Sequence, residues 1–161
     1  MKNKIIFKLK IILAIFIFNN CSHSDKNLKP LIDEFKLQTY VKQFNKDDEE
    51  LYANISNKDA LNFLQKNIPL FECPDIDIER TYYFRWWTYR KHIKNTEDGY
   101  VITEFLPDVP WSGKHNTISC PAAHHYYEGR WLHNTKFLDY YSYFWLRKGG
   151  EPRLYSFWIA D

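Results

Sequence analysis

The side chains that could carry chemistry gather in the second half of the chain. Residues 75–161 contain all six tryptophans and 21 of the 30 aromatic residues, interleaved with Arg, His, Asp and Glu. Flat apolar sugar faces stack on aromatic rings, and sugar hydroxyls need paired hydrogen-bond donors and acceptors at close range. This composition predicts a carbohydrate-binding surface. At any single position, the alternative is an aromatic ring that belongs to the core.

Ten residues combine a suitable side chain with a place in this aromatic and charged stretch, and we predict that they contact a sugar: Arg85, Trp87, Trp111, His124, His125, Glu128, Arg130, Trp131, Trp158 and Asp161. The sequence assigns a catalytic role to none of them. It contains no cofactor-binding motif, so no cofactor is expected.

A metal is not expected either. His124 and Glu128 are spaced i and i+4, but this pair alone lacks the further ligands of zinc-protease motifs. The two residues could instead hydrogen-bond each other on one helix face.

The charged candidates also have a structural alternative. Arg85 and Arg130 are alternatively buried ion-pair partners of acidic residues elsewhere in the chain, namely Glu79, Glu104 or Asp139. Glu104 is of a type that can act as acid or base, and its alternative is an exposed carboxylate at a strand end.

The charge balance argues against nucleic acid as a partner. The 22 basic and 20 acidic residues are intermixed and give a net charge of +2. Phosphate backbones require clustered lysine and arginine, which this chain lacks.

The first 20 residues are typical of an export signal. Four lysines precede the apolar run Ile11–Phe18, which is too short to span about 30 Å of hydrocarbon as a helix. Cys21 follows in a polar context and resembles a bacterial lipoprotein acylation site. We therefore expect an exported protein, lipid-anchored through Cys21 at the bacterial cell envelope. A secreted protein or an uncleaved helical tether is the alternative. Cys73 and Cys120 could pair or be buried as small apolar residues.

Residues 21–45 are expected to form a polar tether, and residues 46–161 to form the folded part. Ser56 and Asp59 make a capping-box pattern, which predicts an amphipathic helix that ends at Pro69.

The strongest helix signal covers residues 75–94, with acidic residues in its first turn and basic residues near its end. Residues 82–90 are aromatic on nearly every face, so this helix must be buried against more than one neighbour. Residues 100–106 alternate loosely and predict an extended segment. Residues 111–116 predict a polar loop of the kind that often carries binding residues.

Two further helices are expected at 117–132 and 135–147, together forming a helical hairpin. Asn134 is placed to cap the second helix, and Gly149 to end it. Residues 152–161 are typical of the start of another helix.

Five segments carry a resemblance to a known family: residues 82–90 (YYFRWWTYR), 99–107 (GYVITEFLP), 119–125 (SCPAAHH), 128–132 (EGRWL) and 155–158 (YSFW). They resemble the amino-terminal part of bacterial six-hairpin (α/α)6-toroid glycoside hydrolases of the mannosylglycerate hydrolase-like group, relatives of mannosyl-oligosaccharide glucosidase and trehalase. The resemblance implies a mainly α fold, in which residues 46–161 form an incomplete toroid with a short extended segment.

The resemblance also implies an inverting O-glycosyl hydrolysis in full-length relatives. Inversion needs two carboxyl groups about 6.5–9.5 Å apart, which those relatives carry on later hairpins. The chain would then hold only part of the substrate-binding floor, with an oligosaccharide as ligand and the rest of the toroid as partner. Asp161 falls where trehalase-like relatives carry a Trp-Asp pair, but here Ile159 and Ala160 separate it from Trp158.

Three hypotheses remain open from the sequence. The first is a truncated glycoside hydrolase that retains its substrate-binding portion. The second is a free-standing carbohydrate-binding surface lipoprotein without catalysis. The third is an inactive remnant that folds poorly, because an open arc of a toroid would expose aromatic faces.

Overall fold

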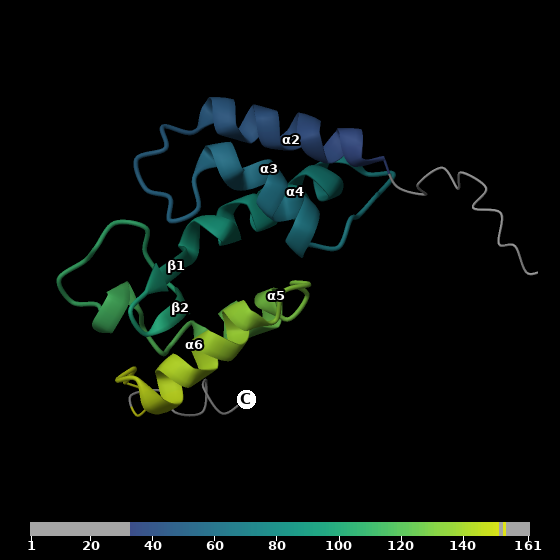
Figure 1. The fold of residues 1–161 in the computed structure, drawn as a ribbon. Coiled ribbons are helices and arrows are strands. Elements are labelled where there is room, and N and C mark those ends of the chain that lie inside the picture. The colour runs from purple at the N-terminus through teal and green to yellow at the C-terminus, as the bar shows by residue number, and fades with distance from the viewer. Residues whose placement is uncertain (1–32, 152, 154–161) are drawn as a thin grey trace, which may run out of the picture. The chain divides into compact units, whose positions relative to one another are not determined.

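The computed structural model describes residues 33–151 and residue 153, which are mainly helical (Figure 1). They form, in chain order, α2 (Glu34–Asp47), α3 (Asn57–Asn67), α4 (Ile76–His92), β1 (Ile93–Thr96), β2 (Gly99–Ile102), a 3₁₀ helix (Lys114–Asn116), α5 (Ala122–Gly129) and α6 (Lys136–Arg147). The predicted mainly α fold with a short extended segment is confirmed. Within the part of the chain that the structure describes, none of the helices is long and apolar enough to cross a membrane.

Several predictions concern residues outside the described ranges. They are the export signal over residues 1–20, the lipid anchor on Cys21, and the sugar contacts of Trp158 and Asp161. These stay predictions.

Helix α2 corrects the predicted extent of the polar tether, because residues 34–45 are helical and packed. The Asp33 side chain caps the helix by accepting a hydrogen bond from Phe35 N at 2.9 Å. The apolar side chains on one face recur at i, i+3, i+4 and i+7 and are buried: Leu37, Tyr40, Val41 and Phe44. The polar residues between them lower the mean hydropathy of the segment but lie on its exposed face.

Helices α3 and α4 begin where the sequence predicts them to begin. Ser56 Oγ accepts a hydrogen bond from Asp59 N at 3.3 Å, as the capping-box pattern requires. Asp75 Oδ1 accepts from Asp77 N at 3.0 Å and from Ile78 N at 3.3 Å, which satisfies two of the free N–H groups at the start of α4.

A β-hairpin follows α4 directly, so the last two residues of the helix predicted over 75–94 belong to strand β1 instead. Strand β1 pairs with β2 in antiparallel fashion. Thr96 Oγ1 donates to Gly99 O at 2.7 Å across the turn, and Gly99 adopts a φ of 100°, which favours glycine. A Cβ atom on Gly99 would lie 2.4 Å from Tyr140 Cδ1, so α6 packs directly against the hairpin.

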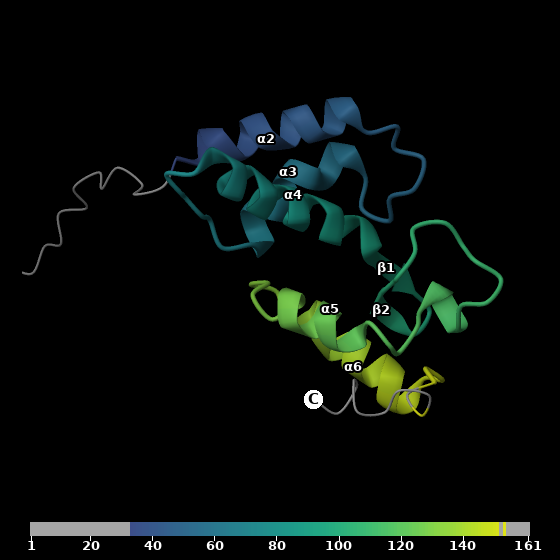
Figure 2. The ribbon, with the colours of Figure 1, turned by 180° about the vertical axis from the view of Figure 1, so that it is seen from behind.

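Helices α5 and α6 pack against each other and form the predicted helical hairpin (Figures 1 and 2), since the Tyr126 hydroxyl donates to Ser142 Oγ at 3.0 Å and the Tyr126 and Tyr141 rings stack with centroids 5.2 Å apart. Helix α5 is shorter than the predicted range 117–132, because Pro121 has no N–H to extend a helix backwards and α5 begins after it. The predicted helix 135–147 is confirmed within one residue. Asn134 Oδ1 accepts from Lys136 N at 3.2 Å and so supports its first turn.

Helix α4 is the centre of the packing. It contacts α2 and α3 on one side and approaches α5 on the other, which confirms that it is buried against more than one neighbour. Phe63 of α3 and Phe137 of α6 bring the two groups of helices together, with ring centroids 5.8 Å apart. Burial of each such side chain stabilises the fold by roughly 1.5–3 kcal/mol.

The two cysteines of the folded part are both free thiols. Cys73 is half-buried and Cys120 is exposed, so the structure shows neither of the two alternatives, a disulfide or full burial.

Candidate functional site

Two of the predicted sugar-contacting residues meet between α4 and α5. Arg85 Nη2 donates to Glu128 Oε2 at 2.8 Å, and the arginine side chain is largely exposed. The partner of Arg85 is thus none of the predicted alternatives Glu79, Glu104 and Asp139. Because an ion pair this exposed contributes only about 0–1 kcal/mol to stability, its donors and acceptors remain accessible to a ligand at little cost.

A cavity of about 620 Å³ opens on one side of this ion pair, within the size range of small-ligand sites. It is lined by Asp75, Asp77, Ile78, Thr81, Tyr82, Arg85, Trp86, Tyr127, Glu128 and Trp131. Two of these rings face solvent, since Trp131 is 59% exposed and Tyr127 is 48% exposed. Exposed rings beside an arginine and a carboxylate are a combination that suits sugar recognition.

Arg130 lies beside this cavity without lining it. Its guanidinium carbon is 5.2 Å from the ring centroids of both Tyr127 and Trp131. Such cation–π contacts contribute about 0.5–1 kcal/mol at exposed positions and restrain the orientation of the rings. Arg130 therefore supports the aromatic wall of the cavity.

A smaller cavity of about 290 Å³ lies on the other side of the ion pair. It is lined by Arg85, Thr88, Tyr89, His92, Ile102, Thr103, Glu104, Pro121, His124, His125 and Glu128. The two cavities share Arg85 and Glu128 as lining residues. Together they form one binding surface, called here the α4–α5 groove.

His125 is held from both sides in the smaller cavity. Its Nδ1 is 3.0 Å from the Tyr141 hydroxyl, and its Nε2 is 3.4 Å from Glu104 Oε2. Burial raises the pKa of Tyr141 far above its ordinary value. The hydroxyl therefore stays protonated and can donate a hydrogen bond to His125 Nδ1. The Nε2 proton then faces the Glu104 carboxylate, and the imidazole is fixed in one orientation.

The position of α5 against α4 depends on one hydrogen bond and one glycine. The Tyr89 hydroxyl donates to His125 O at 2.8 Å, which attaches the middle of α5 to α4. A Cβ atom on Gly129 would lie 2.2 Å from Tyr89 Oη, so only glycine permits this approach. The local sequence thus sets the width of the groove.

Trp87 does not reach the groove. It is 4% exposed, its indole Nε1 donates to Asn45 Oδ1 at 2.8 Å, and Arg90 and Lys91 stack on its ring. With Phe84 it lines a separate cavity of about 620 Å³ on the α2 side of α4. Trp87 thus belongs to the core cluster and lines a different cavity from Arg85, so its predicted sugar contact is not part of the α4–α5 groove.

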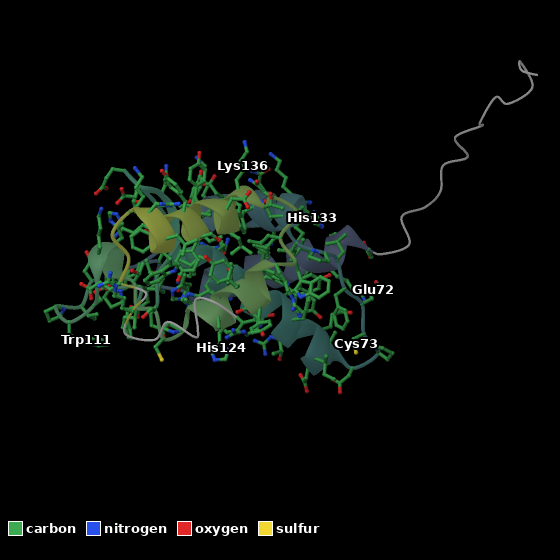
Figure 3. All side chains as sticks on the ribbon, turned by 90° about the horizontal axis from the view of Figure 1, so that it is seen from below. Glu72, Cys73, Trp111, His124, His133 and Lys136 are labelled. Atoms are coloured by element: carbon green, nitrogen blue, oxygen red, sulfur yellow. The ribbon has the colours of Figure 1, made fainter. Side chains whose placement is uncertain are left out.

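Trp111 is exposed but lies apart from the groove. The residue is 64% exposed. Among the described residues, the one aromatic ring that it contacts is that of Phe105, with ring centroids 4.7 Å apart. Figure 3 shows Trp111 at one edge of the molecule, away from His124 on α5. It lines neither cavity of the groove.

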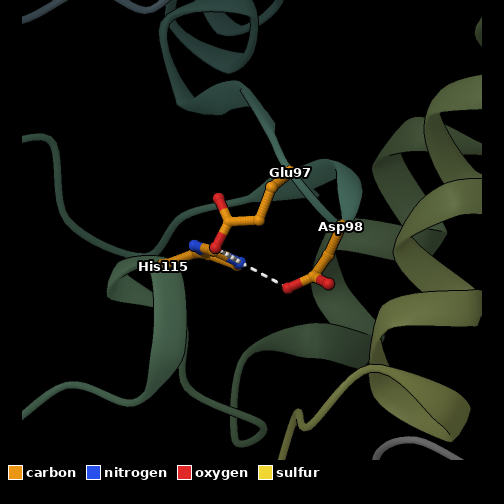
Figure 4. Close-up of side chains that lie close together, drawn as sticks. All are labelled: Glu97, Asp98 and His115. Atoms are coloured by element: carbon orange, nitrogen blue, oxygen red, sulfur yellow. Dashed lines mark hydrogen bonds and ion pairs between the residues drawn. The ribbon is translucent and has the colours of Figure 1, made fainter.

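A group of possible metal ligands lies between the turn of the β-hairpin and the 3₁₀ helix. Ligand atoms of Glu97, Asp98 and His115 lie within 4.8 Å of one another (Figure 4). His115 Nε2 is 2.8 Å from Asp98 Oδ2, which also accepts from the Lys114 ammonium. Hydrogen bonds from Lys114 and His115 lower the pKa of Asp98. These bonds tie the loop to the hairpin, and we assign the cluster to the architecture of the loop.

Some lining residues of the groove were not predicted from the sequence. Tyr127 lies four residues before Trp131, and in the helix predicted over 117–132 this spacing places both on one face, which could have identified Tyr127. In the structure α5 ends at Gly129, and Trp131 lies in the turn after it. The sequence pattern indicates Asp75 and Asp77 only as helix-starting charges. No sequence signal connects them to α5, because only the folded chain brings the two segments together.

Comparison with solved structures finds a sialidase that is similar to this chain. The two share 42% sequence identity with a TM-score of 0.71, over 73% of this chain. The chain spans only 11% of the length of that sialidase. No protein-family model and no curated protein matches the chain. The fold is therefore similar to a small part of that sialidase.

Proposed function

We propose that the α4–α5 groove binds a glycan, and that the chain is the substrate-binding portion of a glycosidase-related protein. The observation that carries the proposal is that five predicted sugar-contacting residues, from α4 and from α5 with the turn after it, line two cavities that share Arg85 and Glu128: Arg85, His124, His125, Glu128 and Trp131. The likeness to part of a sialidase supports it from an independent direction.

The larger cavity supplies the stacking surface. Trp131 and Tyr127 offer their rings to the apolar face of a sugar, while Arg130 restrains them from behind. The Arg85–Glu128 pair offers a planar donor and a carboxylate acceptor to neighbouring hydroxyls.

The smaller cavity supplies polar groups in a narrower space. His125 and Glu104 present an oriented donor and acceptor. The buried Thr88 hydroxyl, which lines the same cavity, has no hydrogen-bond partner among the described residues. The oxygen itself is closed to solvent, so a ligand in this cavity does not contact it in this conformation.

The finer expectations from the family resemblance belong to this proposal. They are that the helices form part of an (α/α)6 toroid, that longer relatives hydrolyse O-glycosyl bonds with inversion, and that the chain is exported and anchored through Cys21. The proposal assigns no bond cleavage to the described residues.

The test uses two matched tryptophan variants of the full chain. Trp131 and Trp111 are similarly exposed, at 59% and 64%, but only Trp131 lines the groove. Binding to a glycan array, followed by calorimetric titration with the best neutral ligand, measures affinity. We expect Trp131→Ala to weaken binding by about tenfold or more, since aromatic anchors dominate interface energies. Trp111→Ala should leave the affinity unchanged.

Loss of binding in Trp111→Ala with no loss in Trp131→Ala would place the sugar elsewhere and reject the groove. Release of a free sugar by the same preparation would favour a hydrolytic fragment over the alternative, a free-standing carbohydrate-binding protein.

A further inference from the structure

The α4–α5 groove carries an excess of negative charge. Its lining includes four carboxylates, from Asp75, Asp77, Glu104 and Glu128, and one guanidinium, from Arg85. Three histidines, His92, His124 and His125, also line the smaller cavity, and burial lowers the pKa of His92, which favours its neutral form. The local field therefore favours neutral or cationic ligands.

The one guanidinium in the lining is already neutralised. Arg85 Nη2 is bonded to Glu128 Oε2 at 2.8 Å, and the two side chains project from different helices toward each other. Recognition of a carboxylate or sulfate normally uses an arginine fork free to make two parallel hydrogen bonds. To bind an anion with this nitrogen, Arg85 would have to break its hydrogen bond to Glu128, and the Glu128 carboxylate would then lie unpaired beside the negatively charged ligand.

Arg130 does not reverse this balance. Its guanidinium stacks on the rings of Tyr127 and Trp131 and lies outside the lining of both cavities. If Arg130 is counted together with the lining residues, the groove has four carboxylates and two guanidinium groups and is still negatively charged.

We propose that the groove selects uncharged glycan segments and discriminates against sugars that carry a carboxylate, such as sialic acids. This inference rests on the proposed glycan-binding function and specifies its ligand class. The name of the similar solved structure does not decide the question, because the likeness covers 11% of that chain. Electrostatic discrimination of this kind weakens with ionic strength, which gives the inference a signature of its own.

The experiment compares matched glycan pairs that differ only by a terminal sialic acid, for example lactose and 3′-sialyllactose, on an array and then by calorimetric titration of the full chain. At low ionic strength we expect the sialylated member of each pair to bind about tenfold more weakly, and the difference to shrink in about 0.5 M salt.

A variant sharpens the comparison. Glu128→Gln removes one carboxylate and frees Arg85, so the ratio of sialylated to neutral affinity should rise by about tenfold, even if both affinities change. Glu97→Gln removes an exposed carboxylate outside the groove and should leave the ratio as it is. Circular dichroism checks that both variants are folded. The ratio of sialylated to neutral affinity measured for the wild type tests the proposal even if a variant does not fold.

The outcomes separate the two proposals. Equal or tighter binding of sialylated glycans at low ionic strength would overturn the selectivity and leave glycan binding in place. Binding of no member of any pair would overturn the glycan-binding function itself, and the selectivity with it.

Discussion

Helix α4 presents aromatic and charged residues on both of its long faces, but the two faces meet different surroundings. The face toward α2 carries Glu79, Tyr83 and Trp87, all at most 4% exposed. The face toward α5 carries Arg85, which is exposed and paired with Glu128 across the groove. The residue types are the same on both faces, and the neighbouring helix decides which of them can meet a ligand.

The closed face is satisfied internally. Glu79 accepts hydrogen bonds from the Tyr40 hydroxyl at 3.0 Å and from Cys73 N at 2.9 Å, and the Lys36 ammonium lies 3.4 Å away. On the open face the short helix α5 leaves Trp131 and Tyr127 uncovered. An aromatic and charged composition is therefore compatible with a core or with a binding surface, and burial distinguishes them.

The largest expected effect comes from truncating the tryptophan of the closed face. Trp87→Ala removes a buried ring that stacks near Phe44 and Phe84, and should lower the free energy of unfolding by about 3–5 kcal/mol. Trp131→Ala, on the open face, should lower it by no more than about 1 kcal/mol. Denaturant unfolding of both variants measures the difference. Similar losses of stability would erase the distinction between the two faces.

The acid stability of the closed face should depend on Glu79. Burial alone would raise its pKa, but hydrogen bonds from Cys73 N and the Tyr40 hydroxyl, together with the Lys36 charge, outweigh burial and lower the pKa below its ordinary value of 4.5. Ionised Glu79 therefore stabilises the fold above pH 4.5, and this contribution is lost as the pH falls through the lowered pKa.

Glu79→Gln should be less stable than the wild type by about 1–3 kcal/mol at neutral pH, because the buried donors lose a charged acceptor. Its stability should also fall less steeply as the pH decreases below 4.5. Glu49→Gln, at an exposed position, is the control and should follow the wild-type curve. A Glu79→Gln curve that parallels the wild type in acid would show that Glu79 does not link stability to pH.

The sequence predicts the parts of the fold that depend on local chemistry. Capping by Ser56 and Asp75 locates the starts of α3 and α4. Asn134, whose side-chain oxygen accepts a hydrogen bond from Lys136 N, locates the start of α6. The hairpin after α4 depends on Gly99 and on its contact with α6, so local helix propensity overestimates the end of α4. The sequence does not indicate the packing of α2, because the polar and charged residues of this segment obscure its apolar face.

The candidate site was predicted in its residue types and only partly in its geometry. Arg85, Glu128 and Trp131 were predicted and do meet in the groove. Trp87 lies two residues from Arg85, and a rotation of about 200° around the helix axis puts it on the other face. Which of those faces is open depends on where α2 and α5 pack, and no single-residue property specifies that.

The central claim is that ligand contact is confined to the α5-facing side of α4. The most direct measurement follows the indole N–H signals of the nitrogen-15-labelled full chain by NMR during titration with a neutral glycan, assigned with single Trp→Phe variants. The account predicts that the Trp131 signal shifts while the signals of Trp87 and Trp111 stay in place. Shifts at Trp87 or Trp111 with an unchanged Trp131 signal would contradict it.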